Sequence, residues 1–256
     1  MQGIAAGVPY VALPPASGRT DAPVVAGWHL LDPPRSEAAL AAALPLAGLD
    51  AWRVYFGLPL TGARAPEGGL EKLAYQDAVL NVFGPLAFGA AAEFPAAYAA
   101  VRRELGVRSD RLAVLGGSQG ALVAQQVATT RPVDAIVLVS PVTRLRPVVT
   151  ANERRYGVTY EWTPASDYVA GVLDFVARAA ELTAPALLVV GADDAADGVL
   201  EPAAALQAAL PGSRLETVPG MGHAFAAEPG LEAAPQTPHA ATADRIITDW
   251  LRDHLS

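Results

Sequence analysis

The sequence predicts an α/β fold with a mostly parallel central sheet flanked by helices. Continuous apolar runs at 134–140 and 186–191 are typical of parallel strands that are buried on both faces. A third apolar run, 112–117, ends in a glycine-rich turn and continues with helical spacing. Strands that alternate with helices along a chain form a parallel sheet with right-handed crossovers.

The elements before the third run follow from periodicity and from turn residues. Residues 4–13 alternate loosely up to a Pro-Pro pair and are expected to form an edge strand or hairpin. A short buried strand is predicted at 23–28, a helix capped by Ser36 at 36–44, and another strand at 51–58.

The stretch 70–105 has a helical pattern that contains three breaking residues. Gly84, Pro85 and Pro95 are expected to divide it into at least two helical pieces. Towards the C-terminus, the pattern predicts a helix, a strand and a closing amphipathic helix. Their expected ranges are 200–210, 214–219 and 242–255.

Length, composition and charge limit the possible functions. The chain has 256 residues and 52% hydrophobic content, without a linker, repeat or low-complexity segment, so we expect one domain over residues 1–256. The absence of cysteine excludes disulfides and thiol chemistry, and four histidines without a close cluster predict no metal. The net charge of −8 disfavours nucleic acid and anionic membranes as partners.

The N-terminus predicts neither a leader nor an anchor. It has no basic region, and no uninterrupted apolar run approaches the roughly 18 residues of a membrane span. We therefore expect a cytoplasmic protein without a membrane span.

The turn after 112–117 has the pattern Gly-x-Ser-x-Gly, which is typical of a nucleophile elbow. Side chains two positions before and after such a serine would collide with the adjoining strand and helix, and Gly116 and Gly120 occupy these positions. The turn lifts the Ser118 hydroxyl above the sheet, next to the N-terminus of the following helix. Ser118 is the predicted nucleophile, and a glycine-rich turn with an incidental serine is the alternative.

A serine hydroxyl becomes a good nucleophile when a neutral imidazole accepts its proton. His223 lies in a glycine-rich loop just after the last predicted strand, from which it can reach the carboxyl edge of the sheet. His239 and His254 lie in or beside the final helix, and His29 follows the first main strand. We predict that His223 is the base, with a structural loop histidine as the alternative.

The histidine in turn needs an acid that sets its tautomer and stabilises its cation. Asp193, Asp194 and Asp197 follow the buried strand 186–191. Acidic residues in such loops are also turn formers and helix caps, so at least one of the three has that role. If Asp194 is the acid, Asp193 is expected to be a solvent-facing turn residue and Asp197 a cap for a helix that begins near Gly198, and both remain alternatives for the acid. An acid here, between Ser118 and His223, gives the chain order nucleophile, acid, histidine.

With these three features the chain resembles the α/β-hydrolase superfamily over nearly its whole length. The motifs Gly116-Gly117-Ser118-Gln119-Gly120 and Gly222-His223-Ala224-Phe225 are similar to those of its dienelactone-hydrolase-like and acetyl-esterase-like branches. The family acid usually holds the last position of Gly-x-x-Asp after a strand, which implies Asp194. Dienelactone hydrolases use a cysteine nucleophile, so their substrate does not carry over. Dehalogenases and epoxide hydrolases carry aspartate at the position of Ser118 and are disfavoured.

The resemblance also implies an oxyanion hole made of two backbone N–H groups. The first is that of Gln119, the residue after the nucleophile. The second comes from the loop after the first main strand, where the usual His-Gly pair is replaced by Gly27-Trp28-His29-Leu30. Trp28 and His29 are the two candidates, and the Trp28 side chain either walls the acyl pocket or packs on the core.

The expected function is hydrolysis of a small-molecule carboxylic ester through an acyl-enzyme, without a cofactor. The alternatives are hydrolysis of an amide, peptide or thioester by the same residues, and a non-catalytic binding module on the same fold. The connection 141–182 lies where this fold commonly carries a cap. Its aromatic residues include Tyr160 and Trp162, which we expect to bind substrate, unless they only pack the cap onto the sheet.

Overall fold

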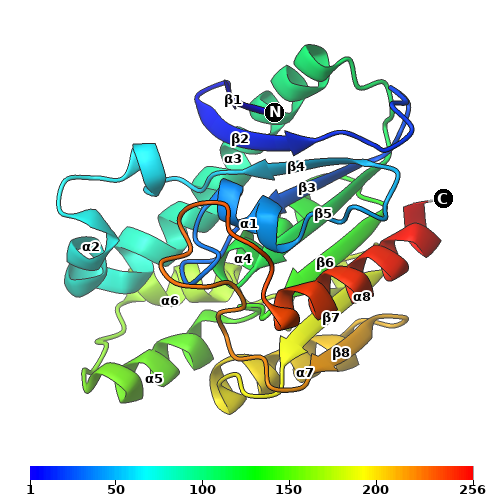
Figure 1. Cartoon of the computed structure of the whole chain (residues 1–256). Coiled ribbons are helices and arrows are strands. Elements are labelled where there is room, and N and C mark those ends of the chain that lie inside the picture. Colours follow the sequence, from blue (N-terminus) through cyan, green and yellow to red (C-terminus); the bar gives the residue numbers. More distant parts are fainter. Residues whose placement is uncertain (256) are drawn as a thin grey trace.

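The computed structural model describes residues 1–255 and is built around an eight-stranded sheet (Figure 1). The strand order across the sheet is β1-β2-β4-β3-β5-β6-β7-β8. The strands are β1 (Gln2–Ala5), β2 (Val8–Leu13), β3 (Val24–Trp28), β4 (Trp52–Phe56), β5 (Leu112–Gly117), β6 (Ala135–Val139), β7 (Ala186–Gly191) and β8 (Arg214–Val218). The helices are α1 (Glu37–Ala43), α2 (Gly69–Ala78), α3 (Gly84–Leu105), α4 (Gln119–Thr130), α5 (Leu145–Tyr156), α6 (Pro164–Val172), α7 (Glu201–Ala209) and α8 (Pro238–Leu255). Four short helical turns complete the order: η1 (Gly62–Arg64), η2 (Val79–Phe83), η3 (Ala179–Glu181) and η4 (Ala196–Leu200).

The sheet is parallel from β4 to β8 and antiparallel only at one edge. β1 pairs with β2 and β2 with β4 in antiparallel register, whereas every pair from β4–β3 to β7–β8 is parallel. The mostly parallel α/β sheet predicted from the sequence is therefore confirmed. The segment 4–13, expected to be an edge strand or hairpin, belongs to the hairpin of β1 and β2 that forms the antiparallel edge.

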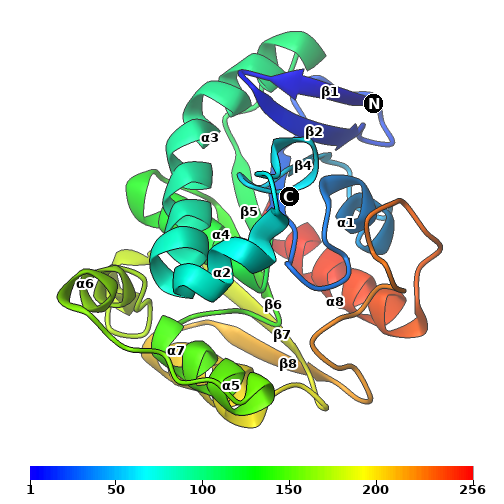
Figure 2. The ribbon, with the colours of Figure 1, turned by 90° about the vertical axis from the view of Figure 1, so that its left-hand side faces the viewer.

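Two hydrophobic cores lie on the two faces of the sheet. Side chains alternate along β5, so that Leu112 and Val114 face one core while Ala113 and Leu115 face the other. The first core packs under α3, α4 and α7, and the second under α1 and α8 (Figure 2). Because both faces are covered, β5, β6 and β7 consist of buried residues throughout, which explains their continuous apolar runs.

The helical run between β4 and β5 breaks at a different place from the one expected. Asp77 has an extended backbone (φ −165°, ψ 105°), and its carboxylate accepts the N–H of Leu80 at 2.8 Å. The side chain thus caps the helical turn that follows. The expected division into at least two helical pieces is confirmed by α2 and α3, and α3 begins at Gly84 with Pro85 in its first turn. The backbone nevertheless stays helical at Gly84, and the break expected at Pro95 was wrong, because Pro95 lies inside α3.

By length and composition alone, the run from Gly69 to Leu105 is apolar enough to cross a membrane, and 39% of its most apolar window is buried. Core helices of globular proteins pass the same test. Within this run, Leu86, Phe94 and Val101 of α3 are buried in the core under that helix. The packing of α3 on the sheet accounts for its apolar composition.

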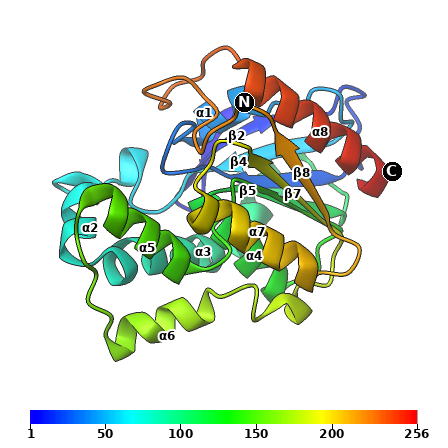
Figure 3. The ribbon, with the colours of Figure 1, turned by 90° about the horizontal axis from the view of Figure 1, so that it is seen from below.

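The connection 141–182 contains α5, α6 and η3 and lies beyond the edge at which the parallel strands end (Figure 1). Helix α5 contacts η4, and α6 contacts η2. Figure 3 shows α5 and α6 on the same side of the sheet as α7, away from α8. A β-carbon on Gly84 would lie 3.2 Å from Val169 of α6, so the two segments approach closely. The connection 141–182 therefore packs on η2, the helical turn just after Asp77, and on η4, the helical turn just after Asp194.

Candidate active site

Ser118 stands on a strained turn between β5 and α4. Its backbone has φ 46° and ψ −112°, a conformation that residues other than glycine seldom adopt. A β-carbon on Gly116 would collide with the carbonyl of Gly120, and one on Gly120 with the carbonyl of Trp28. The Ser118 N–H donates to the carbonyl of Val139 on β6 at 2.9 Å. Both glycines are thus required for the close approach of strand and helix.

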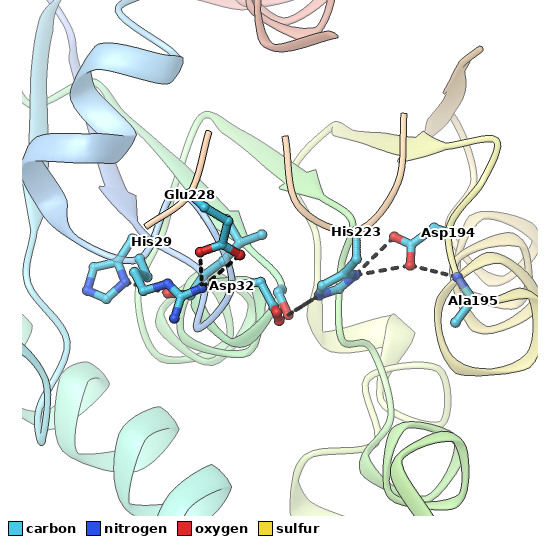
Figure 4. A network of polar contacts seen from close by, with 9 residues as sticks. His29, Asp32, Asp194, Ala195, His223 and Glu228 are labelled. Atoms are coloured by element: carbon cyan, nitrogen blue, oxygen red, sulfur yellow. Dashed lines mark hydrogen bonds and ion pairs between the residues drawn. The ribbon is translucent and has the colours of Figure 1, made fainter. Parts of the chain in front are cut away.

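The structure brings Ser118, His223 and Asp194 together in one chain of hydrogen bonds. His223 Nε2 lies 2.8 Å from Ser118 Oγ. On the other side of the ring, His223 Nδ1 lies 3.1 and 3.0 Å from the two carboxylate oxygens of Asp194 (Figure 4). Asp194 Oδ1 also accepts the N–H of Ala195 at 2.7 Å. The Asp194 side chain is 1% exposed and that of His223 is 26% exposed. The imidazole therefore connects the buried carboxylate of Asp194 with the hydroxyl of Ser118.

The surroundings of His223 favour its charged form. Burial lowers the pKa of His223, but the hydrogen bond and the charge of Asp194 raise it, as does the charge of Asp32. Arg155 of α5 acts in the opposite direction, and the net result is a raised pKa. An imidazole in this place is a good acceptor for the proton of Ser118.

Backbone contacts hold the acid loop against the histidine loop. A β-carbon on Gly191 would collide with the carbonyl of Met221, so only glycine allows the two loops to approach this closely. The Asp193 N–H donates to the same carbonyl at 2.9 Å, and the Ala192 N–H donates to Val218 at 3.0 Å. The loops after β7 and β8 are thereby tied together two residues before His223.

The two neighbouring aspartates lie apart from the imidazole. Asp193 is exposed. Asp197 forms an ion pair with Arg154 of α5. The expectation that Asp197 caps a helix near Gly198 was wrong, because the helical turn η4 already begins at Ala196 and places Asp197 inside it.

The loop after β3 presents a free backbone N–H beside the elbow. Within residues 1–255, the N–H groups of Gln119 and His29 have no hydrogen-bond partner, whereas the Leu30 N–H donates to Pro34. The Val24 N–H donates to the carbonyl of Arg111, the residue just before β5. In a parallel strand, every second residue directs its N–H to the same neighbouring strand, so Ala26 and Trp28 also face β5. Trp28 therefore directs its N–H into the ladder with β5.

The side chain of Trp28 packs in the core. It is 1% exposed, and its ring lies 5.0 Å from the ring of Phe94 and 6.0 Å from that of Phe56. Of the two sequence-based expectations for this side chain, these contacts agree with core packing.

The imidazole of His29 fastens two loops together. Its Nδ1 lies 2.6 Å from the carbonyl of Leu30, and its Nε2 accepts the N–H of Leu58 at 3.3 Å. Burial is the largest cause that lowers the pKa of His29; with the raising effect of the hydrogen bond to the Leu30 carbonyl and the smaller lowering effect of the Arg64 charge, the net pKa is about 4. His29 is therefore neutral near pH 7, with its proton on Nδ1.

This burial predicts a pH-dependent stability. In the unfolded chain His29 takes up a proton near its ordinary pKa of 6.5, but the folded protein resists protonation down to about pH 4. Its stabilising contribution is therefore complete above pH 6.5 and is lost as the pH falls to 4, about 3 kcal/mol in total. Urea unfolding across this range should show a steeper loss of stability in the wild type than in His29→Gln. If the free energy of unfolding fell with the same slope against pH in both proteins, buried neutral His29 would not be the cause. His223, whose raised pKa acts in the opposite direction, is present in both proteins and does not affect the comparison.

Tyr160 and Trp162 form a pair in the connection 141–182. Their ring centres are 4.9 Å apart, and Arg146 lies over the Trp162 ring at 4.1 Å. Tyr160 donates its hydroxyl to Asp77 at 2.7 Å. Both side chains are partly buried against the core under α3. The carboxylate that caps η2 thus also holds the connection in place.

Sequence reasoning missed one charged group at the site. Asp32 Oδ2 lies 3.9 Å from His223 Nε2, on the side of the imidazole opposite Asp194 (Figure 4). No local motif marks Asp32, because loop packing alone brings it to a residue far along the chain. Among residues 1–255, no group of three or more His, Asp or Glu side chains is arranged to hold a metal ion.

The comparisons with solved structures agree on the fold. TT1662 from Thermus thermophilus is 18% identical, with a TM-score of 0.71 over 100% of this chain and 97% of that one. The esterase Est1E from Butyrivibrio proteoclasticus, solved with ferulic acid bound, is 13% identical, with a TM-score of 0.64 over 99% and 98%. An acylaminoacyl peptidase from Pyrococcus horikoshii is 13% identical, with a TM-score of 0.66 over 97% of this chain and 40% of that one.

The sequence comparisons add a relative and a family. An uncharacterized protein of Mycobacterium tuberculosis strain H37Rv is 34% identical over 136 residues, which are 53% of this chain and 46% of that protein. The chain therefore matches about half the length of its curated relative. The model of the prolyl oligopeptidase family, Peptidase_S9, matches residues 90–256, which include Ser118, Asp194 and His223. The α/β-hydrolase superfamily expected from the sequence is confirmed, although the matching family differs from the two branches that the motifs suggested. The chain belongs to the prolyl oligopeptidase family of serine hydrolases.

Proposed function

We propose that this protein hydrolyses a small-molecule carboxylic ester in the cytoplasm, with Ser118 as nucleophile, His223 as general base and acid, and Asp194 as the acid that orients His223. The observation that carries the proposal is the unbroken chain of hydrogen bonds from Ser118 through His223 to Asp194. Similarity to solved esterases supports the fold on which such a site operates.

Each group has a defined part in the reaction. Ser118 Oγ attacks the ester carbonyl carbon while His223 Nε2 takes its proton, and Asp194 stabilises the resulting imidazolium at Nδ1. The bond to the leaving oxygen then breaks, and that oxygen receives the proton from Nε2. A water molecule repeats the sequence on the acyl-enzyme and releases the acid and Ser118.

Two backbone N–H groups are proposed to hold the carbonyl oxygen when it becomes negative. Gln119 supplies one from the N-terminus of α4, where the helix dipole adds to the attraction. His29 is the better of the two candidates for the other, because its N–H has no partner within residues 1–255 while that of Trp28 faces the β5 ladder. No cofactor takes part in this scheme.

We propose the connection 141–182 as a cap, with Tyr160 and Trp162 walling the acyl side of the site. Trp162→Ala should then change the relative rates across p-nitrophenyl esters of increasing chain length, because it removes a large apolar surface. The measurement is kcat/KM for each ester, with Tyr168→Ala as control, since the Tyr168 side chain is 72% exposed. A variant with lower stability and an unaltered chain-length profile would show that Trp162 only packs the cap.

The experiment that tests the proposed function compares ester and peptide substrates. The same residues can cleave both, and the family match leaves a peptide substrate as the second candidate. Turnover of p-nitrophenyl esters well above that of peptide anilides supports the esterase, and the reverse order supports a peptidase. A fluorophosphonate probe that fails to label Ser118 would instead indicate a non-catalytic binding protein.

A further inference from the structure

Asp32 places a carboxylate where the leaving group of a substrate must pass. It belongs to the loop between β3 and α1, and its side chain is 43% exposed. Its Oδ2 lies 3.9 Å from His223 Nε2, the same nitrogen that lies 2.8 Å from Ser118 Oγ. Figure 4 shows Asp32 and Asp194 on opposite sides of the imidazole. The Asp194 carboxylate contacts His223 Nδ1, whereas the Asp32 carboxylate lies near His223 Nε2, the nitrogen that takes and returns the proton in the proposed reaction.

The backbone around Asp32 is anchored to the histidine loop. Phe225 donates its N–H to Pro33 at 3.1 Å, and Arg35 donates its N–H to Gly230 at 2.8 Å. Arg35 also forms an ion pair of 3.1 Å with Glu228 in the same loop. These contacts, at Pro33 and Arg35, tie the short segment after Asp32 to the loop that carries His223 and so hold Asp32 close to the imidazole.

The carboxylate of Asp32 is available to a ligand. Within residues 1–255 its one ion-pair contact is the 3.9 Å approach to His223, and no arginine or lysine is paired with it. The other charged groups that act on His223 are Asp194, which is buried at Nδ1, and Arg155, which stands on the cap helix α5. The charge next to His223 Nε2 is therefore the negative charge of the Asp32 carboxylate.

We propose that Asp32 selects esters whose leaving alcohol carries a positive charge close to the scissile oxygen, and that it disfavours anionic leaving groups. The inference rests on the proposed esterase function. When Ser118 Oγ has bonded to the acyl carbon, the bond from that carbon to the leaving oxygen breaks. The electron pair stays on the oxygen, which takes the proton from His223 Nε2.

Geometry links this step to Asp32. The leaving oxygen must come within hydrogen-bond distance of Nε2 to receive the proton. The group attached to that oxygen then lies next to the Asp32 carboxylate, at the exposed side of the imidazole. A cation two carbons from the oxygen is attracted there, and an anion is repelled.

Three acetate esters with the same acyl group test the proposal: acetylcholine, its neutral isostere 3,3-dimethylbutyl acetate, and the anionic 3-acetoxypropanoate. The wild type should favour the cationic over the neutral ester in kcat/KM by roughly fivefold, the size expected for a partly exposed charge pair. Asp32→Asn should bring this ratio close to one, and Asp32→Lys should favour the anionic ester. High salt should reduce the wild-type ratio.

Asp253→Asn is the matched control, because it removes the same charge from an exposed position on α8. It should leave the ratio unchanged. Each ratio is measured within one enzyme preparation, so a loss of folded protein cancels, and Asp32→Ser provides a second neutral replacement.

The outcomes separate the two proposals. Turnover of the neutral ester with no preference for the cation, or a preference that survives in both Asp32→Asn and Asp32→Ser, overturns the role of Asp32 and leaves the esterase intact. No turnover of any of the three acetates, together with no fluorophosphonate labelling, overturns the esterase and the role of Asp32 with it.

Discussion

Replacing Ser118 by alanine is expected to lower kcat/KM for any ester substrate by on the order of a thousandfold or more, as in other triad deletions. In the proposed reaction the acyl-enzyme forms on Ser118 Oγ. Among the serine hydroxyls of residues 1–255, this is the one that is hydrogen-bonded to His223 Nε2, at 2.8 Å, so no other serine can replace it. The rates are measured with a p-nitrophenyl ester. Labelling by a fluorophosphonate should disappear in parallel.

The fold should survive this change. The Ser118 side chain makes no helix-capping hydrogen bond, and the change to alanine removes a single oxygen atom, so little space opens. Ser140→Ala is the control, since Ser140 follows the neighbouring strand β6 and its buried hydroxyl has no hydrogen-bond partner within the described residues. Circular dichroism of both variants should match the wild type. Near wild-type turnover in Ser118→Ala would refute the proposed mechanism.

The parts of the fold that the sequence predicted depend on local physical requirements. Strands β5, β6 and β7 are buried on both faces, and strands of this kind have continuous apolar runs in their sequences. The elbow is equally local, because the backbones at Gly116 and Gly120 leave no room for a β-carbon. Such features are readable without knowledge of distant residues.

The features that were missed depend on segments far apart in the sequence. Asp77 ends one helix and begins the next, and its carboxylate also accepts the hydroxyl of Tyr160. The stronger breakers Gly84 and Pro85 are instead accommodated in the first turn of α3. Asp32 reaches His223 only because the loops after β3 and β8 are bonded together at Pro33 and Phe225. Periodicity and turn residues carry no information about such pairings.

The choice of acid among three aspartates also depends on tertiary contacts. Both oxygens of Asp194 lie within 3.1 Å of His223 Nδ1, and its side chain is 1% exposed. Asp193 is exposed, although its N–H helps to join the two loops, and Asp197 is paired with Arg154. The resemblance to α/β-hydrolases implied Asp194 from its place three residues after Gly191, and the contacts now supply a physical basis for the same proposal.

Asp194→Asn is therefore expected to lower kcat/KM near neutral pH by on the order of 10⁴-fold. The Ala195 N–H, 2.7 Å from Oδ1, would retain the amide oxygen of the new side chain and turn its NH₂ group towards His223. Nδ1 would then accept a hydrogen bond, the imidazole proton would move to Nε2, and Nε2 could no longer take the proton of Ser118. Asp193→Asn and Asp197→Asn should remain within about tenfold of wild type, a change of up to about 1.4 kcal/mol in the barrier. The three variants are compared by kcat/KM with folding checked by circular dichroism. The assignment fails if Asp194→Asn stays within that tenfold range while one of its neighbours loses activity.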